Sequence, residues 1–510
     1  MKCNTKLLAA LVTGTLVAGT LAPGSAMAQK AADTLRAVNY TQIADVTPYY
    51  NQIRDGIVIS HHAWDGLVYR DPETFALKPL LATAWRYVDD TTLEFDLRRG
   101  VKWHDGSNFS ADDVVYTFSS LQGDKLVTTP SNFAWMAGVE KVDDYKVRVK
   151  LKRVFPAAIE YLAMVMPILP KVYRERVGVE AYSKAPVGTG PYRITKVDGV
   201  QQTEFERFDD YYADSPKGKP AIRRLILREV TDPTTALNEL LGGKADWTWN
   251  FIADNFDNVA RMPNLTAVRG GTMRVNFLGL DSAGRSGADN PITKVKVRQA
   301  IAYAINRADM AKNLMQGGAR VLDTPCYPTQ FGCEESAASR YSYDPAKAKA
   351  LLAEAGYPNG FDTELVTFVP SQFATATQNY LAAVGIRAKV SLLQVQAVIQ
   401  RSMEGSIPLT LTNWGSYSVN DVSAFLPFFF TGSNQDYTRD AELQRLIEQG
   451  GANSNPDERR KNYTAAIKLI TEKVYLLPMY NSVTTYGLSK QLNFKPYADE
   501  LPRFYLSTWK

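Results

Sequence analysis

The chain has 510 residues, of which 45% are hydrophobic and 22% are charged, and this balance excludes a disordered protein. Its length exceeds what a single hydrophobic core usually supports, so we expect two or three domains. The formal net charge of +5 is weak and evenly spread, which argues against a nucleic-acid partner.

Residues 1–28 have the layout of a secretory signal peptide. Two early lysines are followed by an apolar core at residues 7–21 and by the small residues of a cleavage site at 26–28. The core is too short and too interrupted to remain in a bilayer as a permanent helix. Because Cys3 lies far upstream of the cleavage point, we expect no lipid anchor. The mature chain should begin at Gln29 and be soluble in the periplasm, with the net charge lowered by two.

Helix and strand patterns alternate along the rest of the chain, which predicts mixed α/β domains. Ser110 and Asp113 fit a capping box at the start of one helix. Residues 295–305 carry apolar side chains at the spacing of a buried helix stripe. Asp344 begins a further helix, with a proline as its first residue, and Gly356 ends it.

A strand–helix–strand unit is predicted next. Residues 363–368 form its first strand, residues 374–384 its helix and residues 387–393 its second strand, the pattern of a parallel crossover. A last long helix at residues 456–474 then leads into an apolar strand at residues 475–480.

Two cysteines remain after removal of the signal peptide. Cys326 and Cys333 lie close together in a turn-rich segment, and in an oxidising compartment this spacing predicts a local disulfide. Zinc binding is the alternative, but it is disfavoured because no CxxC motif or histidine lies nearby.

The sequence offers few groups for catalysis. Its histidines are His61, His62 and His104, for which structural or surface positions are favoured over metal binding. No GxSxG, HExxH or Walker A motif is present, and residues 242–244 (Gly-Gly-Lys) lack the spacing of a phosphate-binding loop. Adjacent acid pairs fall at turns or helix starts and would not converge as in a glycosidase. We therefore predict a binding protein without a cofactor or metal, and keep a hydrolytic enzyme on the same fold as the alternative.

Four blocks of sequence resemble one known family. Residues 95–114, Phe-Asp-Leu-Arg-Arg-Gly-Val-Lys-Trp-His-Asp-Gly-Ser-Asn-Phe-Ser-Ala-Asp-Asp-Val, resemble the signature of the family 5 extracellular solute-binding proteins. These are the oligopeptide-, dipeptide- and nickel-binding components of ABC importers. Residues 186–192 (Pro-Val-Gly-Thr-Gly-Pro-Tyr), 295–307 and 351–361 resemble further blocks of the family in the same order.

The resemblance implies an α/β fold of the periplasmic binding protein type (class II, cluster C), in which two hinged lobes and an accessory domain are present. It places lobe I at residues 29–65, 206–290 and 483–510, the accessory domain at 66–205 and lobe III at 291–482. It also implies a monomer that captures a small solute between the lobes and delivers it to an inner-membrane ABC permease with separate ATPase subunits.

The ligand-binding residues are expected where strands end at the crevice between the lobes, since α/β folds place their ligands there. By position and by resemblance, the candidates are Tyr40, Trp249, Asn250, Phe251, Arg274, Asn276, Arg401, Asn413, Trp414, Tyr417, Ser418 and Asp421.

The candidate site departs from the peptide-binding pattern in two places. Peptide-binding members supply a tryptophan, matched here by Trp414, and then an aspartate for the α-amine of the peptide, at a position that Ser418 occupies. A buried ammonium without a carboxylate costs several kcal/mol, so either Asp421 replaces the aspartate or no free peptide N-terminus is bound. Residues 369–375, which resemble a loop that supplies an arginine for the ligand carboxylate, contain no basic residue.

The nature of the solute therefore stays open at this level. One hypothesis is a short peptide or a peptide-like or opine-like conjugate, and the other is an opine that carries a sugar or phosphate. For an anionic solute, Arg274 and Arg401 are the candidate contacts, although each could equally be a solvated surface arginine.

Overall fold

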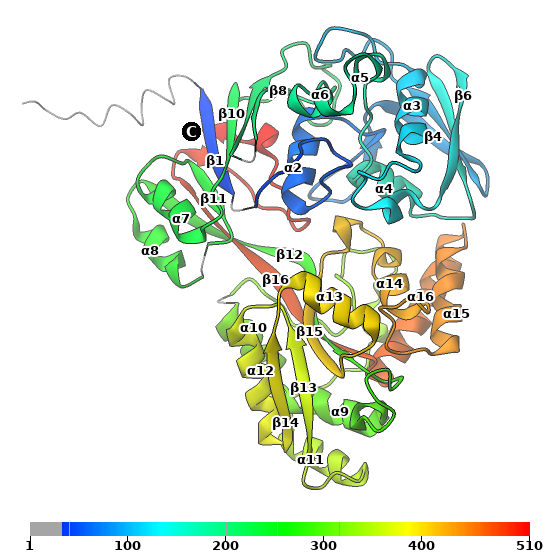
Figure 1. The fold of residues 1–510 in the computed structure, drawn as a ribbon, viewed down its shortest axis with the longest axis vertical. Helices are drawn as coiled ribbons and strands as arrows, with labels where there is room; N and C mark the ends of the chain where they lie inside the picture. The colour runs from blue at the N-terminus through cyan, green and yellow to red at the C-terminus, as the bar shows by residue number, and fades with distance from the viewer. Residues whose placement is uncertain (1–32, 40, 200, 252, 316) are drawn as a thin grey trace, which may run out of the picture.

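Two bodies joined by two long strands make up the molecule. The computed structural model describes residues 33–510 apart from 40, 200, 252 and 316, so the predicted signal peptide and the candidate Tyr40 lie outside the described residues. In Figure 1 the upper and lower bodies are connected by β12 (Leu265–Leu280) and β16 (Leu476–Ser489).

One ten-stranded sheet runs through both bodies, in the order β14-β13-β15-β12-β16-β11-β1-β10-β9-β8. Antiparallel pairing of β12 with β16 extends from Leu265 opposite Ser489 to Gly279 opposite Leu476, and the register shifts twice between these ends. The remaining strands are β13 (Phe361–Thr367), β14 (Ile386–Leu392) and β15 (Leu409–Trp414) in the lower body, and β1 (Thr34–Asn39), β8 (Tyr192–Asp198), β9 (Gln202–Arg207), β10 (Arg224–Glu229) and β11 (Trp247–Trp249) in the upper body.

The upper body also contains a separate four-stranded sheet in the order β4-β5-β7-β6. Helices pack around it and around the end of the large sheet (Figure 1). Outside the ten-stranded sheet, the strands of the upper body are β2 (Val68–Arg70), β3 (Leu77–Pro79), β4 (Ala82–Asp89), β5 (Thr92–Leu97), β6 (Met136–Asp143), β7 (Lys146–Leu151), β17 (Leu492–Asn493) and β18 (Thr508–Trp509). Its helices are α2 (Arg54–Ala63), α3 (Ala111–Leu121), α4 (Ala158–Met164), α5 (Lys171–Val177), α6 (Val179–Lys184), α7 (Pro233–Leu241) and α8 (Phe256–Arg261).

Helices surround the sheet of the lower body (Figure 1). They are α9 (Val295–Ala304), α10 (Arg307–Leu314), α11 (Pro345–Glu354), α12 (Ser371–Ala383), α13 (Val395–Glu404), α14 (Leu426–Phe430), α15 (Ala441–Gly451) and α16 (Pro456–Glu472). Among the described residues, no helix is long and apolar enough to cross a membrane.

The helix signals in the sequence are confirmed. The Ser110 hydroxyl accepts a hydrogen bond from the backbone of Asp112, and the Asp113 carboxylate accepts one from the Ser110 N–H, so both halves of the capping box form at α3. At α11, the Asp344 carboxylate accepts the Lys347 N–H at 2.9 Å. The predicted stripe at residues 295–305 corresponds to α9.

The predicted strand–helix–strand unit is also confirmed, as β13, α12 and β14. Strands β13 and β14 pair in parallel from Phe361 opposite Ile386 to Thr367 opposite Leu392. The strand after the last helix is longer than the predicted 475–480, because β16 runs on to Ser489 and pairs with β11 of the upper body. That continuation depends on tertiary pairing, which the local apolar pattern does not record.

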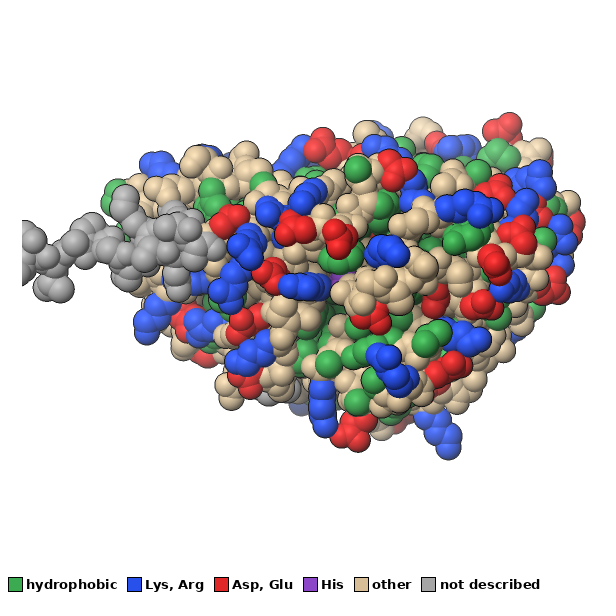
Figure 2. Space-filling view, turned by 90° about the horizontal axis from the view of Figure 1, so that it is seen from above, with side chains coloured by type: hydrophobic (Ala, Val, Ile, Leu, Met, Phe, Trp, Pro, Cys, Tyr) green, Lys and Arg blue, Asp and Glu red, His purple; other side chains and the backbone are tan. Residues whose placement is uncertain are grey.

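Charges of both signs mix on the surface of the protein. On the face shown in Figure 2, lysine and arginine side chains alternate with aspartate and glutamate side chains. Many are paired in exposed ion pairs, such as Lys184 with Glu180 at 2.8 Å and Arg387 with Asp362 at 2.7 Å. This mixture agrees with the small net charge and the even charge spread of the sequence.

Gly188 fixes a close contact between two segments of the upper body. A Cβ atom at this position would lie 1.9 Å from the carbonyl oxygen of Ala63. The backbone at Ala63 could move away only by disturbing the packing around it. We expect Gly188→Ala to destabilise the fold by roughly 1–3 kcal/mol, as overpacking does. Gly138→Ala on β6 is the control, because no atom lies within 4 Å of its added Cβ. Equal thermal unfolding midpoints for the two variants would contradict this expectation.

Candidate functional site

Two cavities lie between the upper and lower bodies, and the side chains of Arg274 and Asn413 line both. Their volumes are about 670 Å³ and about 640 Å³, within the usual range of small-molecule sites. We call the larger one the aromatic cavity and the smaller one the polar cavity.

The aromatic cavity lies between residues 128–131 of the upper body and strands β12 and β15 with helices α13 and α14 of the lower body. Its walls are rich in rings: Phe277, Phe368, Trp414, Tyr417, Phe428, Phe429, Phe430, Tyr437 and Tyr475. The wall therefore offers large apolar faces with hydroxyl and amide groups between them.

Trp414, at the end of β15, anchors this aromatic wall. Its ring stacks on Phe428 with centroids 4.8 Å apart and an interplanar angle of 12°, and Tyr417 meets it edge-on at 5.2 Å. The indole N–H donates to the carbonyl oxygen of Ala424 at 3.4 Å. The ring is thus held in place while part of its surface remains exposed toward the cavity.

The polar cavity collects most of the other residues predicted from the sequence. At its edge, the Asn276 amide donates to the carbonyl oxygen of Tyr480 at 3.2 Å and to the Ser482 hydroxyl at 2.9 Å. The predicted residues that line this cavity are Trp249, Asn250, Phe251, Arg274, Asn276 and Asn413.

Glu500 lies between two arginines where the cavities meet. Its carboxylate accepts from Arg274 Nε and Nη2 at 3.0 and 2.8 Å and pairs with Arg54 Nη2 at 2.9 Å. Burial alone would raise the pKa of Glu500, but Arg274 and Arg54 lower it to about 2. The Arg274 guanidinium also donates to Asn413 Oδ1 at 3.1 Å. Both guanidinium groups therefore share one carboxylate within the protein.

Ser418 belongs to a turn that joins the two bodies. Ser416, Tyr417 and Ser418 all adopt positive φ angles, of 50°, 50° and 61°. The buried Ser418 hydroxyl accepts from Arg54 and donates to the carbonyl oxygen of Asp499 at 2.7 Å. Ser418, predicted to occupy an amine-binding position, thus contacts the upper body and does not line either cavity.

Asp499 completes the contact on the upper side. Its carboxylate pairs with Arg70 at 2.9 Å and with Arg503 at 2.6 Å, and all three side chains are buried. Burial by itself would raise the pKa of Asp499, but Arg503 and Arg70 hold it well below the usual range. Arg70 also donates to the carbonyl oxygen of Ser418. Asp499 therefore holds Arg70 in the position from which it contacts this turn, which belongs to the lower body.

Arg401 and Asp421 have partners away from the cavities. Arg401 forms a bidentate pair with Glu364 at 2.9 and 2.7 Å. Asp421 is buried, pairs with Arg459 at 2.8 Å and caps the short helix Val422–Ala424. Neither side chain is part of the wall of the aromatic or the polar cavity. Of the two predicted arginines, Arg274 thus lies in the cavity walls and Arg401 does not. The carboxylate of Asp421 is paired with Arg459 and does not face either cavity.

The histidines contact backbone groups of the upper body. His62 Nδ1 lies 2.7 Å from the carbonyl oxygen of Val58, and its Nε2 accepts the Phe504 N–H at 3.0 Å. Burial lowers the pKa of His62 to about 3 and that of His104 to about 4, so both are neutral at pH 7. Within the described part of the chain, no group of three or more His, Cys, Asp or Glu side chains could hold a metal ion.

Several residues of the site escaped the sequence analysis. Arg54 and Glu500 lie far apart in sequence, and only the tertiary approach of α2 to the C-terminal segment pairs them. Residues 128–131 carry no distinctive signal. The run Phe428-Phe429-Phe430, in contrast, lies shortly after Trp414 and could have been recognised as a second part of an aromatic wall.

Residues 76–437 match the family described as bacterial extracellular solute-binding proteins, family 5 Middle. The chain belongs to this family. This family 5 protein is 25% identical to heme-binding protein A of Haemophilus influenzae over 472 residues, which cover 85% of the chain and 84% of the relative. It is 27% identical to the glutathione-binding protein GsiB of Salmonella choleraesuis over 502 residues, with 93% and 94% covered.

The fold of this family 5 protein is similar to the solved structure of HbpA2 from Haemophilus parasuis. The two share 25% identity with a TM-score of 0.80, over 94% of this chain and all of the other. The predicted periplasmic binding protein-like α/β fold is therefore confirmed, and so is the family suggested by the four sequence blocks. The relatives named here are binding proteins.

Proposed function

We propose that this protein captures a small solute between its two bodies and passes it to an inner-membrane ABC permease with separate ATPase subunits. The observation that supports this function is the pair of cavities of about 670 and 640 Å³ between the bodies, which share Arg274 and Asn413. In this proposal the protein acts as a monomeric binding protein and not as an enzyme.

The two lobes would follow the division expected from the sequence. Residues 29–65, 206–290 and 483–510 form lobe I, residues 66–205 the accessory domain and residues 291–482 lobe III. Strands β12 and β16, which connect the bodies, would serve as the hinge about which the lobes close on the solute.

Short peptides and peptide-like or opine-like conjugates remain the solute classes to compare, with a sugar- or phosphate-bearing opine as the second candidate. An anion that contacts Arg274 would compete with Glu500, which already holds that guanidinium through two hydrogen bonds. The position expected to receive an ammonium group holds Ser418, which lines neither cavity and whose hydroxyl is already bonded to Arg54 and Asp499. The contacts in the structure therefore favour neither a strongly anionic solute nor a free peptide N-terminus.

The function is tested by a thermal-shift screen of the mature protein. Di- and tripeptides are compared with sugar-linked and phosphorylated opines, and the solute that co-purifies from a periplasmic extract is identified by native mass spectrometry. We expect one class to raise the unfolding midpoint in a concentration-dependent way. A protein that binds none of these compounds and carries no co-purifying solute would contradict the proposal, and turnover of a bound compound would favour an enzyme.

Export to the periplasm and a Cys326–Cys333 disulfide belong to the same proposal. The pairing of Cys326 with Cys333 in the structure supports this part of the proposal. Iodoacetamide should label neither cysteine of the mature protein when it is denatured without reductant, and both after reduction. Two labels without reductant would show free thiols and contradict this part of the proposal.

A further inference from the structure

We infer that the aromatic cavity receives an uncharged aromatic group of the solute. This inference rests on the proposed function and narrows it to a class of ligand. It starts from the wall of the cavity, which contains the stacked pair Trp414 and Phe428 together with further rings of β12 and α14 and with Phe368, the residue after β13. Flat apolar faces of this kind select rings through stacked and edge-to-face contacts.

The charged residues of this cavity are already satisfied by the protein. Arg274 and Asp281 are the charged members of the described wall. The Arg274 guanidinium is paired with Glu500, which it shares with Arg54. Asp281 is buried, and its carboxylate accepts from the backbone N–H groups of Arg285 and Ser286 at 3.0 and 2.7 Å.

A charged group of the solute would therefore have to compete with these existing partners for Arg274 or Asp281. Burying an ion without a partner of its own is unfavourable, whereas an uncharged ring loses little on leaving water. Polar side chains of the wall can still bond a neutral polar substituent: the Ser402 hydroxyl, which donates to Gln435 at 2.6 Å, can accept, and Asn413, whose Oδ1 accepts from Arg274, can donate through its amide nitrogen. The cavity thus discriminates against charge rather than against polarity.

The preference of the cavity for an uncharged aromatic group is tested with three dipeptides: Phe-Phe, Ala-Ala and the dipeptide of 4-carboxyphenylalanine. Each is used in the free form and in the N-acetylated amide form, so that terminal charges do not decide the result. We expect at least one form of Phe-Phe to bind, by calorimetry, at least tenfold more tightly than the same form of the other two. Binding of Ala-Ala or of the carboxylated pair as tight as that of Phe-Phe, or no binding of Phe-Phe in either form, would overturn the inference.

A pair of variants locates the effect in the cavity. Phe428→Ala removes the ring that stacks on Trp414, and we expect it to weaken Phe-Phe binding by about tenfold. Tyr343→Ala is the control, since Tyr343 is similarly exposed (43% against 39% for Phe428) and packs on Tyr380 outside both cavities. Equal affinities of the two variants would contradict the inference.

The test separates this inference from the proposed function. If another solute binds between the bodies while Phe-Phe does not, the ligand class is wrong and solute capture stands. If neither the compounds of the thermal-shift screen nor any co-purified solute binds, solute capture itself is contradicted.

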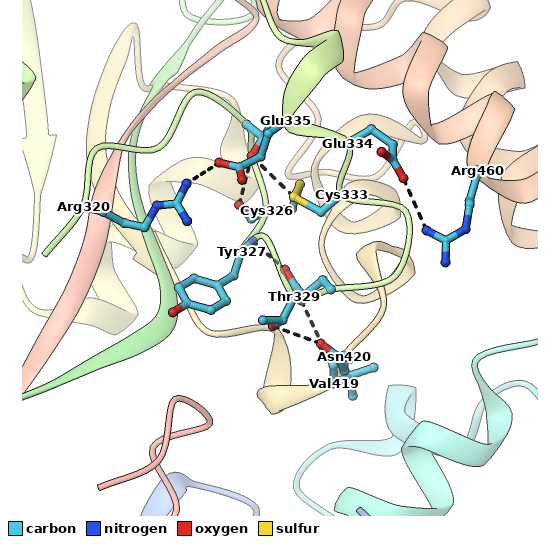
Figure 3. Close-up of a disulfide and its surroundings, with 12 residues drawn as sticks. Arg320, Cys326, Tyr327, Thr329, Cys333, Glu334, Glu335, Val419, Asn420 and Arg460 are labelled. Carbon is cyan, nitrogen blue, oxygen red and sulfur yellow. Dashed lines mark hydrogen bonds and ion pairs between the residues drawn. A yellow bond between two sulfur atoms is a disulfide. The ribbon is translucent and has the colours of Figure 1, made fainter. Parts of the chain in front are cut away.

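A second observation, independent of the cavity chemistry, concerns the loop at residues 326–333, whose ends are joined by the cysteine pair (Figure 3). This loop lies against the segment that follows Trp414. Gln330 Nε2 donates to the carbonyl oxygen of Val419 at 2.9 Å, and the Phe331 N–H donates to that of Asn420 at 3.0 Å.

The contact continues on both sides of these hydrogen bonds. The Val422 N–H donates back to the carbonyl oxygen of Phe331 at 3.1 Å. The guanidinium of Arg459 lies 4.4 Å from the centroid of the Phe331 ring while it pairs with Asp421. We propose that the closed loop is a positioning element, which holds residues 415–424 so that the aromatic wall and the turn at Ser418 keep their places.

Hydrogen exchange with mass spectrometry tests this second proposal without a ligand. Reduction of the cysteines, or Gln330→Ala with the cysteines intact, should increase exchange in residues 415–424 and leave β12 and β16 unchanged, and reoxidation should restore protection. Glu334→Gln, which removes only the exposed pair with Arg460, is the control and should change nothing there. Faster exchange confined to residues 326–333 would overturn the proposal.

Discussion

Replacing Trp414 with alanine is expected to weaken solute binding by roughly tenfold to a hundredfold while the protein stays folded. The indole supplies a large face of the aromatic cavity and stacks on Phe428, so its removal deletes contact area on the solute and frees the neighbouring ring. Because Trp414 is only half-buried and lies at the end of β15, the sheet itself does not depend on it. Calorimetric titration with the solute identified by the thermal-shift screen measures the effect.

Trp414→Phe is the matched control, since it keeps an aromatic face and should retain most of the affinity. Circular dichroism of both variants checks that the fold is intact. An unchanged affinity of Trp414→Ala would remove this residue from the site.

The second large effect concerns stability. Asp499→Asn should destabilise the protein by roughly 3–5 kcal/mol, because it leaves the buried guanidinium group of Arg503 without an ionised partner and leaves Arg70 paired with Glu160 alone. Asp362→Asn removes an exposed pair with Arg387 and should change stability little. Urea unfolding followed by fluorescence measures both, and similar midpoints for the two variants would contradict the account.

The same carboxylates predict how stability depends on pH. Asp499 and Glu500 have lower pKa values in the folded protein than in the unfolded chain, so their contribution is complete above the ordinary carboxyl pKa values. It is lost as the pH falls from about 4.5 toward the folded-state pKa of Glu500 of about 2. Asp499→Asn should lose less stability than the parent protein over this range.

Much of the fold could be predicted because its signals are local. The capping box at Ser110, the start of α11 at Asp344 and the β13–α12–β14 crossover each depend on residues that are close in sequence. The full length of β16 could not be predicted in this way, since its second half is ordered by pairing with β11 and β12.

The site was predictable to a smaller extent. Trp414, Trp249 and Arg274 could be placed near an interlobe crevice from strand ends and from the family resemblance, and the structure puts them in its cavity walls. The partners of charged residues were not predictable, because a sequence does not show which carboxylate approaches which guanidinium. Asp421, which could have replaced the missing aspartate, is instead held by Arg459.

Solution X-ray scattering with and without a saturating solute tests solute capture by closure most directly. We expect the radius of gyration and the maximum dimension to fall when the solute is added, because the two bodies close about β12 and β16, and we expect Trp414→Ala to need a correspondingly higher solute concentration for the same change. Scattering profiles that stay identical in the presence of a solute shown by calorimetry to be bound would contradict closure of the lobes on the solute.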